Sequence, residues 1–140
     1  MILMIRFRKS AVVTAASACT VLAAALVSIA PSASAQVWRV TVSAGTSVGL
    51  GSSQYGSGCA YAVTVEGRPG DAAWFYDTGA FGTFSPQTVT IGSDGRASTS
   101  WTPQVSGWHR IYADSYYGAA ATDSFQVGTG INLGSACVVV

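Results

Sequence analysis

Few side chains in this sequence are of a type that performs catalysis. His109 is the only histidine of the chain, and it alternates with Ile111 and Ala113. In a strand this spacing puts His109 on the inward face, where a lone histidine more often serves structure than base catalysis. No cysteine after residue 35 is left free to act as a nucleophile if the two that occur there form a bridge. We therefore predict no catalytic residue and expect that the protein is not an enzyme.

The other candidates for chemistry are aspartates scattered along the chain. Asp71, Asp77 and Asp114 could converge in a folded sandwich, where their oxygens would suit a calcium ion or an acid pair. Nothing in their spacing demands this, and aspartates beside turns and strand ends are typically solvated. We favour solvated side chains, and we predict no metal ion and no cofactor.

Two cysteines, Cys59 and Cys137, lie beyond residue 35. An even count in an exported domain points to a disulfide, and two cysteines permit a single pairing. A redox or metal-binding pair is the alternative, but these residues have neither CxxC spacing nor clustered histidines. We therefore predict a structural bridge between Cys59 and Cys137.

The first 35 residues have the composition of an export signal. Arg6, Arg8 and Lys9 precede an apolar run over 11–30, and small residues follow up to Ala35. This order of charged, apolar and small-residue regions is typical of a cleavable secretory signal peptide. A retained membrane anchor is the alternative, because the run is long enough to span a bilayer. We predict a signal peptide over 1–35, no membrane span after its cleavage, and a secreted or cell-wall-associated protein.

The charge balance of the predicted mature chain narrows the classes of partner. Three of the seven cations lie in the first ten residues and all six acids lie after residue 35, so cleavage changes the net charge from +1 to −2. A weakly acidic chain with scattered arginines lacks the basic footprint of a nucleic-acid-binding protein. It also gives no reason to expect attraction to anionic lipid. We predict no nucleic-acid partner.

The chain over 36–140 shows the alternation of β-strands and no helical pattern. Period-two runs are separated by Gly, Pro and an Asp94-Gly95 pair that we expect to form a tight hairpin turn. Strands are expected over 37–42, 59–66, 72–77 and 87–91, in two runs within 95–118, and over 119–127, with shorter or irregular segments over 44–58, 78–84 and 131–140. Seven to nine short strands favour one all-β sandwich or small barrel.

Two segments resemble bacterial immunoglobulin-like domains. One is Asp94-Gly95-Arg96-Ala97-Ser98-Thr99-Ser100-Trp101-Thr102-Pro103 with Gly107-Trp108-His109-Arg110-Ile111-Tyr112-Ala113, and the other is Ala73-Trp74-Phe75-Tyr76-Asp77. The resemblance covers most of 59–127 and implies an immunoglobulin-like antiparallel β-sandwich. The chain departs from the family pattern in two ways. The usual disulfide would need a cysteine within 107–113, and these domains normally occur as repeats in long surface proteins rather than as a single copy.

A sandwich of that type places the strand over 72–77 beside the strand over 107–114. If Phe75 and Ile111 point inward, five side chains point outward together, namely Trp74, Tyr76, Trp108, Arg110 and Tyr112. Two tryptophans, two tyrosines and an arginine have the composition of a binding surface. Two alternatives stay open, because the 44–58 loop or the C-terminal segment could cover these rings, and a one-residue register shift would turn them inward.

The function that follows is a secreted or cell-envelope binding or adhesion module, which recognises a protein or a cell-envelope glycan through this aromatic face without catalysis. A structural envelope protein without a soluble ligand is one alternative, and it would bury the same rings. A small-ligand carrier is another, because the segment Gly95-Arg96-Ala97-Ser98-Thr99-Ser100 is similar to the apoproteins that carry enediyne chromophores. A carrier would have a deep apolar cleft.

Overall fold

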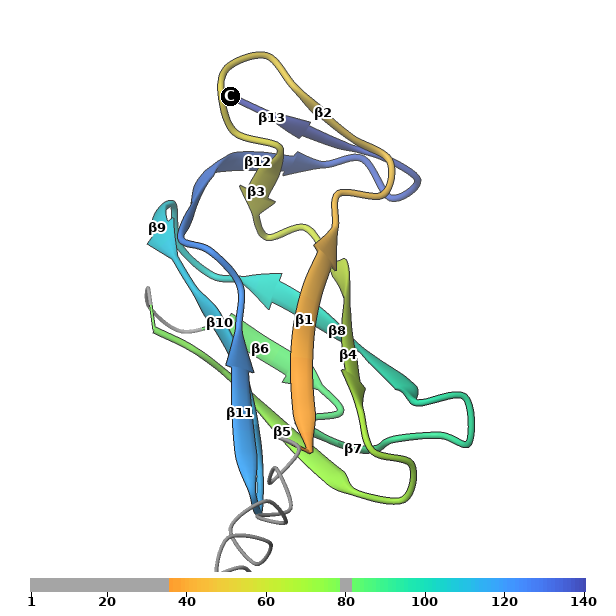
Figure 1. Ribbon diagram of the computed structural model, residues 1–140. Coiled ribbons are helices and arrows are strands. Elements are labelled where there is room, and N and C mark those ends of the chain that lie inside the picture. The colour runs from red at the N-terminus through yellow and green to blue at the C-terminus, as the bar shows by residue number, and fades with distance from the viewer. Residues whose placement is uncertain (1–35, 79–81) are drawn as a thin grey trace, which may run out of the picture. The chain divides into compact units, whose positions relative to one another are not determined.

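Two four-stranded antiparallel sheets pack against each other in the computed structural model, which describes residues 36–78 and 82–140 (Figure 1). These described residues contain thirteen strands and no helix. The all-β sandwich predicted from the alternation is therefore confirmed, but the thirteen strands exceed the seven to nine expected, because the segments expected to be irregular also form short strands. The predicted signal peptide over 1–35 lies outside the described residues.

The first sheet is centred on a strand with strict alternation. In β4 (Tyr61–Gly67) the side chains of Tyr61, Val63 and Val65 are buried, as the sequence predicted. The sheet has the order β1-β4-β8-β6, with β1 (Val37–Ser43), β8 (Arg96–Pro103) and β6 (Gly82–Ser85) as the other members. Hydroxyl-bearing and charged residues alternate with the buried ones, so the outer side of this sheet is polar.

The second sheet pairs the strand over 72–77 with only the second half of the strand expected over 107–114. That strand is wrong as a single element, because it divides at Arg110 and its first half, 107–109, pairs with another sheet. The order of the second sheet is β11-β10-β5-β7, with β11 (Gly118–Ala121), β10 (Ile111–Ser115), β5 (Ala72–Asp77) and β7 (Thr88–Thr90). Phe75 lies opposite Ala113 in the antiparallel register of β5 and β10. Phe75, Ile111 and Ala113 are fully buried, so the predicted phase of both strands is confirmed.

The space between the sheets is filled mainly by large aromatic and branched side chains. Trp101 of β8 is fully buried, and its ring packs against Tyr61, Phe125 and His109. Phe75 stacks on Phe84 with ring centroids 5.6 Å apart. Burying such side chains stabilises the fold by about 1.5–3 kcal/mol each, before the entropy of ordering them is subtracted.

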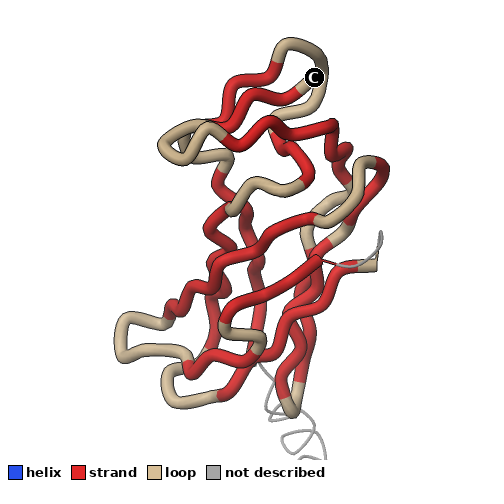
Figure 2. The backbone as a smooth tube through the Cα atoms, turned by 180° about the vertical axis from the view of Figure 1, so that it is seen from behind, coloured by secondary structure: helices blue, strands red, loops and turns tan. Residues whose placement is uncertain are grey.

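A third sheet lies at one end of the sandwich, near the C-terminus (Figure 2). Its strands are β2 (Ser47–Gly49), β13 (Cys137–Val139), β12 (Phe125–Asn132), β3 (Tyr55–Ser57) and β9 (Gly107–His109). The glycine-rich segment over 44–58, which was expected to hold an edge strand or a loop, supplies β2 and β3. Glycine is needed there because a Cβ on Gly56 would lie 2.6 Å from the Cα of Gly130.

The predicted disulfide between Cys59 and Cys137 is confirmed, and it attaches this third sheet to the sandwich. The two Cα atoms are 6.1 Å apart, and both residues are buried. The Tyr61 hydroxyl lies between them and β3, because it accepts a hydrogen bond from the Gly56 amide at 2.7 Å and sits 3.5 Å from the Cys137 sulfur. The disulfide is therefore packed next to the hydrogen bond between the Tyr61 hydroxyl and the Gly56 amide.

Two local predictions are wrong. The strand expected over 119–127 is broken, since β11 ends at Ala121 and β12 begins at Phe125. The break changes the phase, so Ala120 and not Ala121 packs against the core, and Asp123 is exposed. The Asp94-Gly95 turn forms with Gly95 at a φ of 79°, but it joins β7 and β8 of different sheets and so makes no hairpin.

The first strand also departs from simple alternation. A bulge between Val37 and Arg39 leaves Trp38 and Arg39 both exposed. An extra residue in one strand shifts the phase of everything that follows. Val37 and Val40 are consequently both buried, although a strict period of two would have separated them.

We expect the double variant Cys59→Ser/Cys137→Ser to unfold at a lower denaturant concentration than the oxidised protein. The bridge closes a loop of 78 positions, for which the chain-entropy model gives a stabilisation of about 4–5 kcal/mol. Denaturant titration followed by circular dichroism measures the loss. Hydrogen exchange should show the amides of β2 and β13 losing protection first. Equal unfolding midpoints for the two proteins would contradict this prediction.

Candidate functional site

The strand pair β5–β10 carries aromatic side chains on its outer side. Tyr76 lies directly opposite Tyr112, and Trp74 lies directly opposite Asp114. Trp74 is 37% exposed and Tyr76 is 38% exposed. The rings therefore stand on the surface of the described residues, with neither the 44–58 segment nor the C-terminal strands laid over them.

The two tyrosines form a stacked pair. Their ring centroids are 4.9 Å apart and the ring planes differ by 8°. The guanidinium carbon of Arg110 lies 5.2 Å from the Tyr112 centroid, which is within the range of a cation–π contact. Partial burial raises the pKa of the Tyr76 phenol, and the neighbouring Asp114 and Tyr112 raise it further. The pair thus places two stacked phenol rings beside the Arg110 cation.

Trp108 belongs to the same outward phase but to a different sheet. It lies on β9 opposite Gln126 of β12 and is 66% exposed. The stacked contact joins Tyr76 and Tyr112, and in the described part of the chain no ring contact joins Trp108 to either of them. The structure therefore gathers three of the five predicted residues on the β5–β10 pair, with Arg110 directly before β10, and places Trp108 on β9 of the third sheet.

Sequence reasoning missed Asp114 as a member of this surface. Its carboxylate contacts Tyr76, and its Oδ1 atom is buried without a hydrogen-bond partner among the described residues. The prediction that it is a solvated turn residue is wrong, because Asp114 lies within β10. Its phase was the available signal, since Arg110, Tyr112 and Asp114 alternate on one side of the strand.

Asp77 is also not a solvated aspartate, and this prediction is corrected by its burial. Its side chain is 1% exposed and its Oδ2 lies 2.7 Å from Nδ1 of His109, whose side chain is fully buried. Trp101 donates its Nε1–H to the same oxygen at 3.2 Å. Gly82 passes over this cluster so closely that a Cβ there would collide with the Trp101 nitrogen. His109 is thus a core residue, as its phase predicted.

The hydrogen bonds of His109 limit where its protons lie. Nε2 is 3.0 Å from the carbonyl oxygen of Val105, and a carbonyl only accepts, so Nε2 carries a hydrogen. One further proton is needed between Nδ1 and the Asp77 carboxylate to make the 2.7 Å contact a hydrogen bond. With both ring nitrogens engaged in this way, His109 has no nitrogen available to act on a substrate.

The serine in Gly45-Thr46-Ser47-Val48-Gly49 has the G-x-S-x-G spacing of a hydrolase nucleophile, but not its structure. That motif needs a sharp turn between a strand and a helix, whereas Ser47 begins the short strand β2. Its hydroxyl lies 3.3 Å from the Tyr61 hydroxyl rather than beside a base. In the described residues, moreover, no three His, Cys, Asp or Glu side chains gather as a metal site.

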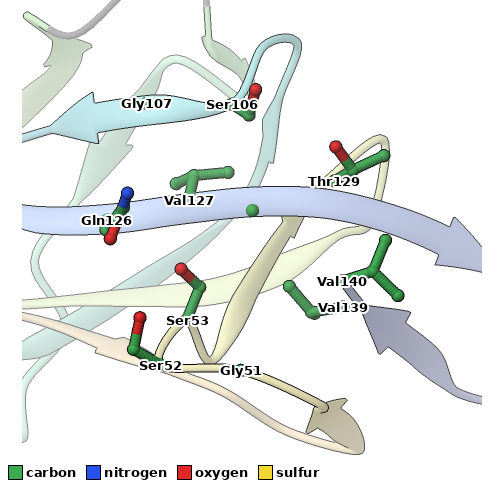
Figure 3. A pocket seen from close by; sticks show the side chains of 11 residues that line it. Gly51, Ser52, Ser53, Ser106, Gly107, Gln126, Val127, Thr129, Val139 and Val140 are labelled. Carbon is green, nitrogen blue, oxygen red and sulfur yellow. The ribbon is translucent and has the colours of Figure 1, made fainter.

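A hollow of about 420 Å³ lies in the third sheet. Figure 3 shows β12 crossing it, with Ser106 on one side and Ser53 on the other. Its lining is mixed and mostly small, namely Gly51, Ser52, Ser53, Ser106, Gly107, Gln126, Val127, Gly128, Thr129, Val139 and Val140. A hollow lined by glycines and hydroxyl groups lacks the apolar walls of a typical small-molecule pocket.

The outer side of the first sheet contrasts with the aromatic surface. Glu66 pairs with Arg96 at 2.9 Å and with Arg39 at 3.8 Å, and both arginine side chains are more than 60% exposed (63% and 64%). Thr64 and Ser98 share a hydrogen bond of 2.9 Å beside them. Exposed ion pairs of this kind stabilise a protein by about 0–1 kcal/mol. Trp38 of β1 is also 56% exposed, but ion pairs and hydroxyl groups otherwise give this sheet the surface of an ordinary solvated protein.

Comparisons with known proteins identify the fold. No family model and no curated protein matches the sequence. A C-terminal 282-residue fragment of intimin, solved in complex with the intimin-binding domain of the translocated intimin receptor, matches with 14% identity and a TM-score of 0.51. The match covers 68% of this chain and 34% of that fragment. The described sandwich thus has the bacterial immunoglobulin-like fold that the sequence predicted, and the chain spans about a third of that fragment.

Two further solved structures are similar. The D00-D0 domain of intimin matches with 12% identity, a TM-score of 0.49, and coverage of 65% of this chain and 46% of that one. The adhesin InvE of Yersinia pseudotuberculosis matches with 12% identity, a TM-score of 0.48, and coverage of 70% and 34%. Separately, no helix long and apolar enough to cross a membrane occurs among the described residues.

We expect His109→Phe to destabilise the fold by about 3–5 kcal/mol. The substitution keeps a ring of similar size but removes the His109 side of its buried pair with the Asp77 carboxylate, and breaking one side of a buried pair costs this much. Urea titration measures the change. Asp123→Asn, at an exposed acid, is the control and should change stability little. A loss for His109→Phe no larger than that of the control would refute the structural role.

We also expect the Tyr76 phenol to ionise above the usual tyrosine pKa of 10.0. An NMR titration of tyrosine ring signals tests this, with Tyr76→Phe used to assign the resonance. Asp114→Asn should lower the Tyr76 pKa, because a neutral amide no longer opposes the phenolate. If Asp114→Asn leaves the Tyr76 pKa unchanged, the carboxylate does not act on that ring.

Proposed function

We propose that this protein is a secreted or cell-envelope binding module that attaches to a partner protein through the outer side of β5 and β10. The observation that carries the proposal is the surface formed by the exposed side chains of Trp74, Tyr76 and Arg110 with the half-buried Tyr112, which contacts both Tyr76 and Arg110. Large aromatic rings left in water on a soluble domain mark interaction sites. Tryptophan, tyrosine and arginine are also the residues that dominate binding energy at protein interfaces.

The arrangement of the rings favours a protein over a glycan. A sugar ring needs an open aromatic face on which to lie, but Tyr76 covers one face of Tyr112 at 4.9 Å and Arg110 lies over the same ring. The pair instead presents the edges of two stacked rings, with their hydroxyl groups, beside the Arg110 cation. Rigid tyrosines lose little entropy on binding and suit a protein surface well.

One similar solved structure supports a protein partner by analogy. The intimin fragment, of which this chain covers 34%, was solved in complex with the intimin-binding domain of the translocated intimin receptor. The predicted signal peptide over 1–35 and the Cys59–Cys137 bridge favour an oxidising compartment outside the cytoplasm. We propose accordingly that the module acts outside the cell or on its surface, without catalysis.

The alternatives are less favoured by the geometry. A structural envelope component without a ligand would bury Trp74 and Trp108, whereas these rings are 37% and 66% exposed. A carrier of a small apolar ligand would need a deep apolar cleft, whereas the hollow in the third sheet has three valines among mostly glycine and hydroxyl-bearing residues. The exposed rings and the lining of this hollow therefore favour a binding surface over a structural component or a ligand carrier.

The proposal predicts that Trp74→Ala and Tyr112→Ala each weaken binding about thirtyfold or more, since truncating a central interface aromatic costs about 2 kcal/mol or more. The full chain is produced in a secreting bacterial host, and the exported protein is purified and profiled on arrays of extracellular proteins. Affinities of the variants for any protein that binds are then measured by surface plasmon resonance.

Thr41→Ala is the matched control, because Thr41 is exposed on the outer side of the first sheet. It should leave affinity unchanged. A parallel glycan array separates the two partner classes, and binding to glycans alone would replace a protein partner by a carbohydrate one. Binding that survives both aromatic substitutions would refute the proposed face.

A further inference from the structure

An aspartate with a buried oxygen lines the same hollow as the residue at which the predicted mature chain begins. Oδ2 of Asp71 is inaccessible and has no hydrogen-bond partner among the described residues. Asp71 and Gln36 line the same hollow, of about 340 Å³, together with Gly70, Ala72, Tyr116 and Tyr117. A buried carboxylate oxygen without a partner costs several kcal/mol, so such atoms are rare in folded proteins.

The backbones of Gln36 and Asp71 are both hydrogen-bonded to Arg68. The Arg68 amide donates to the Gln36 carbonyl at 2.7 Å, and the Arg68 carbonyl accepts from the Asp71 amide at 3.2 Å. Gln36 is only 9% exposed, and the next residue, Val37, is fully buried and lies opposite Gly67. The start of β1 and the turn between β10 and β11 lie at the same end of the sandwich (Figure 1). Residue 36 is therefore a fixed part of this hollow.

We propose that Asp71 binds the α-ammonium group of Gln36, which cleavage after Ala35 creates. The inference rests on the predicted signal peptide and is independent of the aromatic face. Before cleavage the nitrogen of Gln36 is an amide. After cleavage it is an amine that is protonated at neutral pH, and an ammonium is the partner that a buried carboxylate requires. The exposed rings of Tyr116 and Tyr117 lie around the same hollow and add favourable cation–π surface.

The ion pair has a chemical consequence for an N-terminal glutamine. A free α-amine attacks its own side-chain Cδ, so that a C–N bond forms, the side-chain amide leaves as ammonia, and a neutral five-membered lactam remains. Only the unprotonated amine has the electron pair for this attack. A carboxylate partner that favours the ammonium by one pKa unit lowers the reactive fraction roughly tenfold near neutral pH. Asp71 should therefore preserve Gln36 as an open, charged terminus.

The lysine content of the chain allows the reactivity of this terminal amine to be measured without interference from lysine side chains. The only lysine is Lys9, which lies within the predicted signal peptide. The mature chain then has a single primary amine, the α-amino group of Gln36. An amine-reactive reagent consequently reports on that group alone.

The test uses the full chain, exported from a bacterial host and purified from the medium. Mass spectrometry should find a chain that begins at uncyclised Gln36. Labelling of its amine at neutral pH should be roughly tenfold slower than that of a free peptide with the sequence of 36–41, as the reduced unprotonated fraction requires. This comparison needs no variant and so does not depend on a variant folding.

The variant arm compares Asp71→Asn with Asp123→Asn, an exposed control. Asp71→Asn should label, and lose ammonia from Gln36, roughly tenfold faster than the wild type, whereas Asp123→Asn should match the wild type. Three results would overturn the proposal, namely a chain that begins at another residue, a wild-type terminus already cyclised, or labelling as fast as that of the free peptide. If an added alkylamine instead binds wild type but not Asp71→Asn, Asp71 serves an external amine and not the terminus.

Discussion

The packing of Trp101 is the interaction on which the other parts of this structure depend. Its ring is fully buried at the point where the sandwich meets the third sheet. On one side it packs against Tyr61 of β4, and on the other against Phe125 of β12. Its indole nitrogen donates to Asp77, which in turn holds His109. A single side chain thereby joins the apolar core, the buried polar cluster and the C-terminal strands.

The third sheet buries apolar side chains and the disulfide at one end of the sandwich. The 44–58 segment and the C-terminal strands each have too few apolar residues to form a core alone, but together they cover Val127, Val139 and the disulfide. The bridge adds its stabilisation where burial is least, since loop closure restricts the unfolded chain whatever the local packing. Because these strands are held at the end of the sandwich, they do not cover the outer side of β5 and β10.

The two outer sides of the sandwich differ in a way that matters for function. The outer side of the first sheet bears ion pairs and hydroxyl groups, which interact with water about as favourably as with another protein. The other bears Trp74, Tyr76 and Tyr112, whose rings gain by leaving water. The second side also contains Asp114, a partly buried acid beside a stacked tyrosine pair. This asymmetry, rather than any cavity, gives the described residues their clearest functional feature.

The sequence alone determined the fold class, the inward phase of most strands and the disulfide. Period-two alternation is local, so Val63, Phe75 and Ile111 could be assigned to the core without knowledge of their neighbours, and two cysteines allow only one bridge. Only the tertiary structure decided what depends on contacts between distant segments. It buried Asp77 against His109, placed β7 and β8 in different sheets although a turn links them, and paired the 44–58 segment with the C-terminal strands. It also brought Asp71 to Gln36 and Asp114 to Tyr76. These outcomes depend on strand pairing across long sequence separations, which no local pattern of residue types specifies.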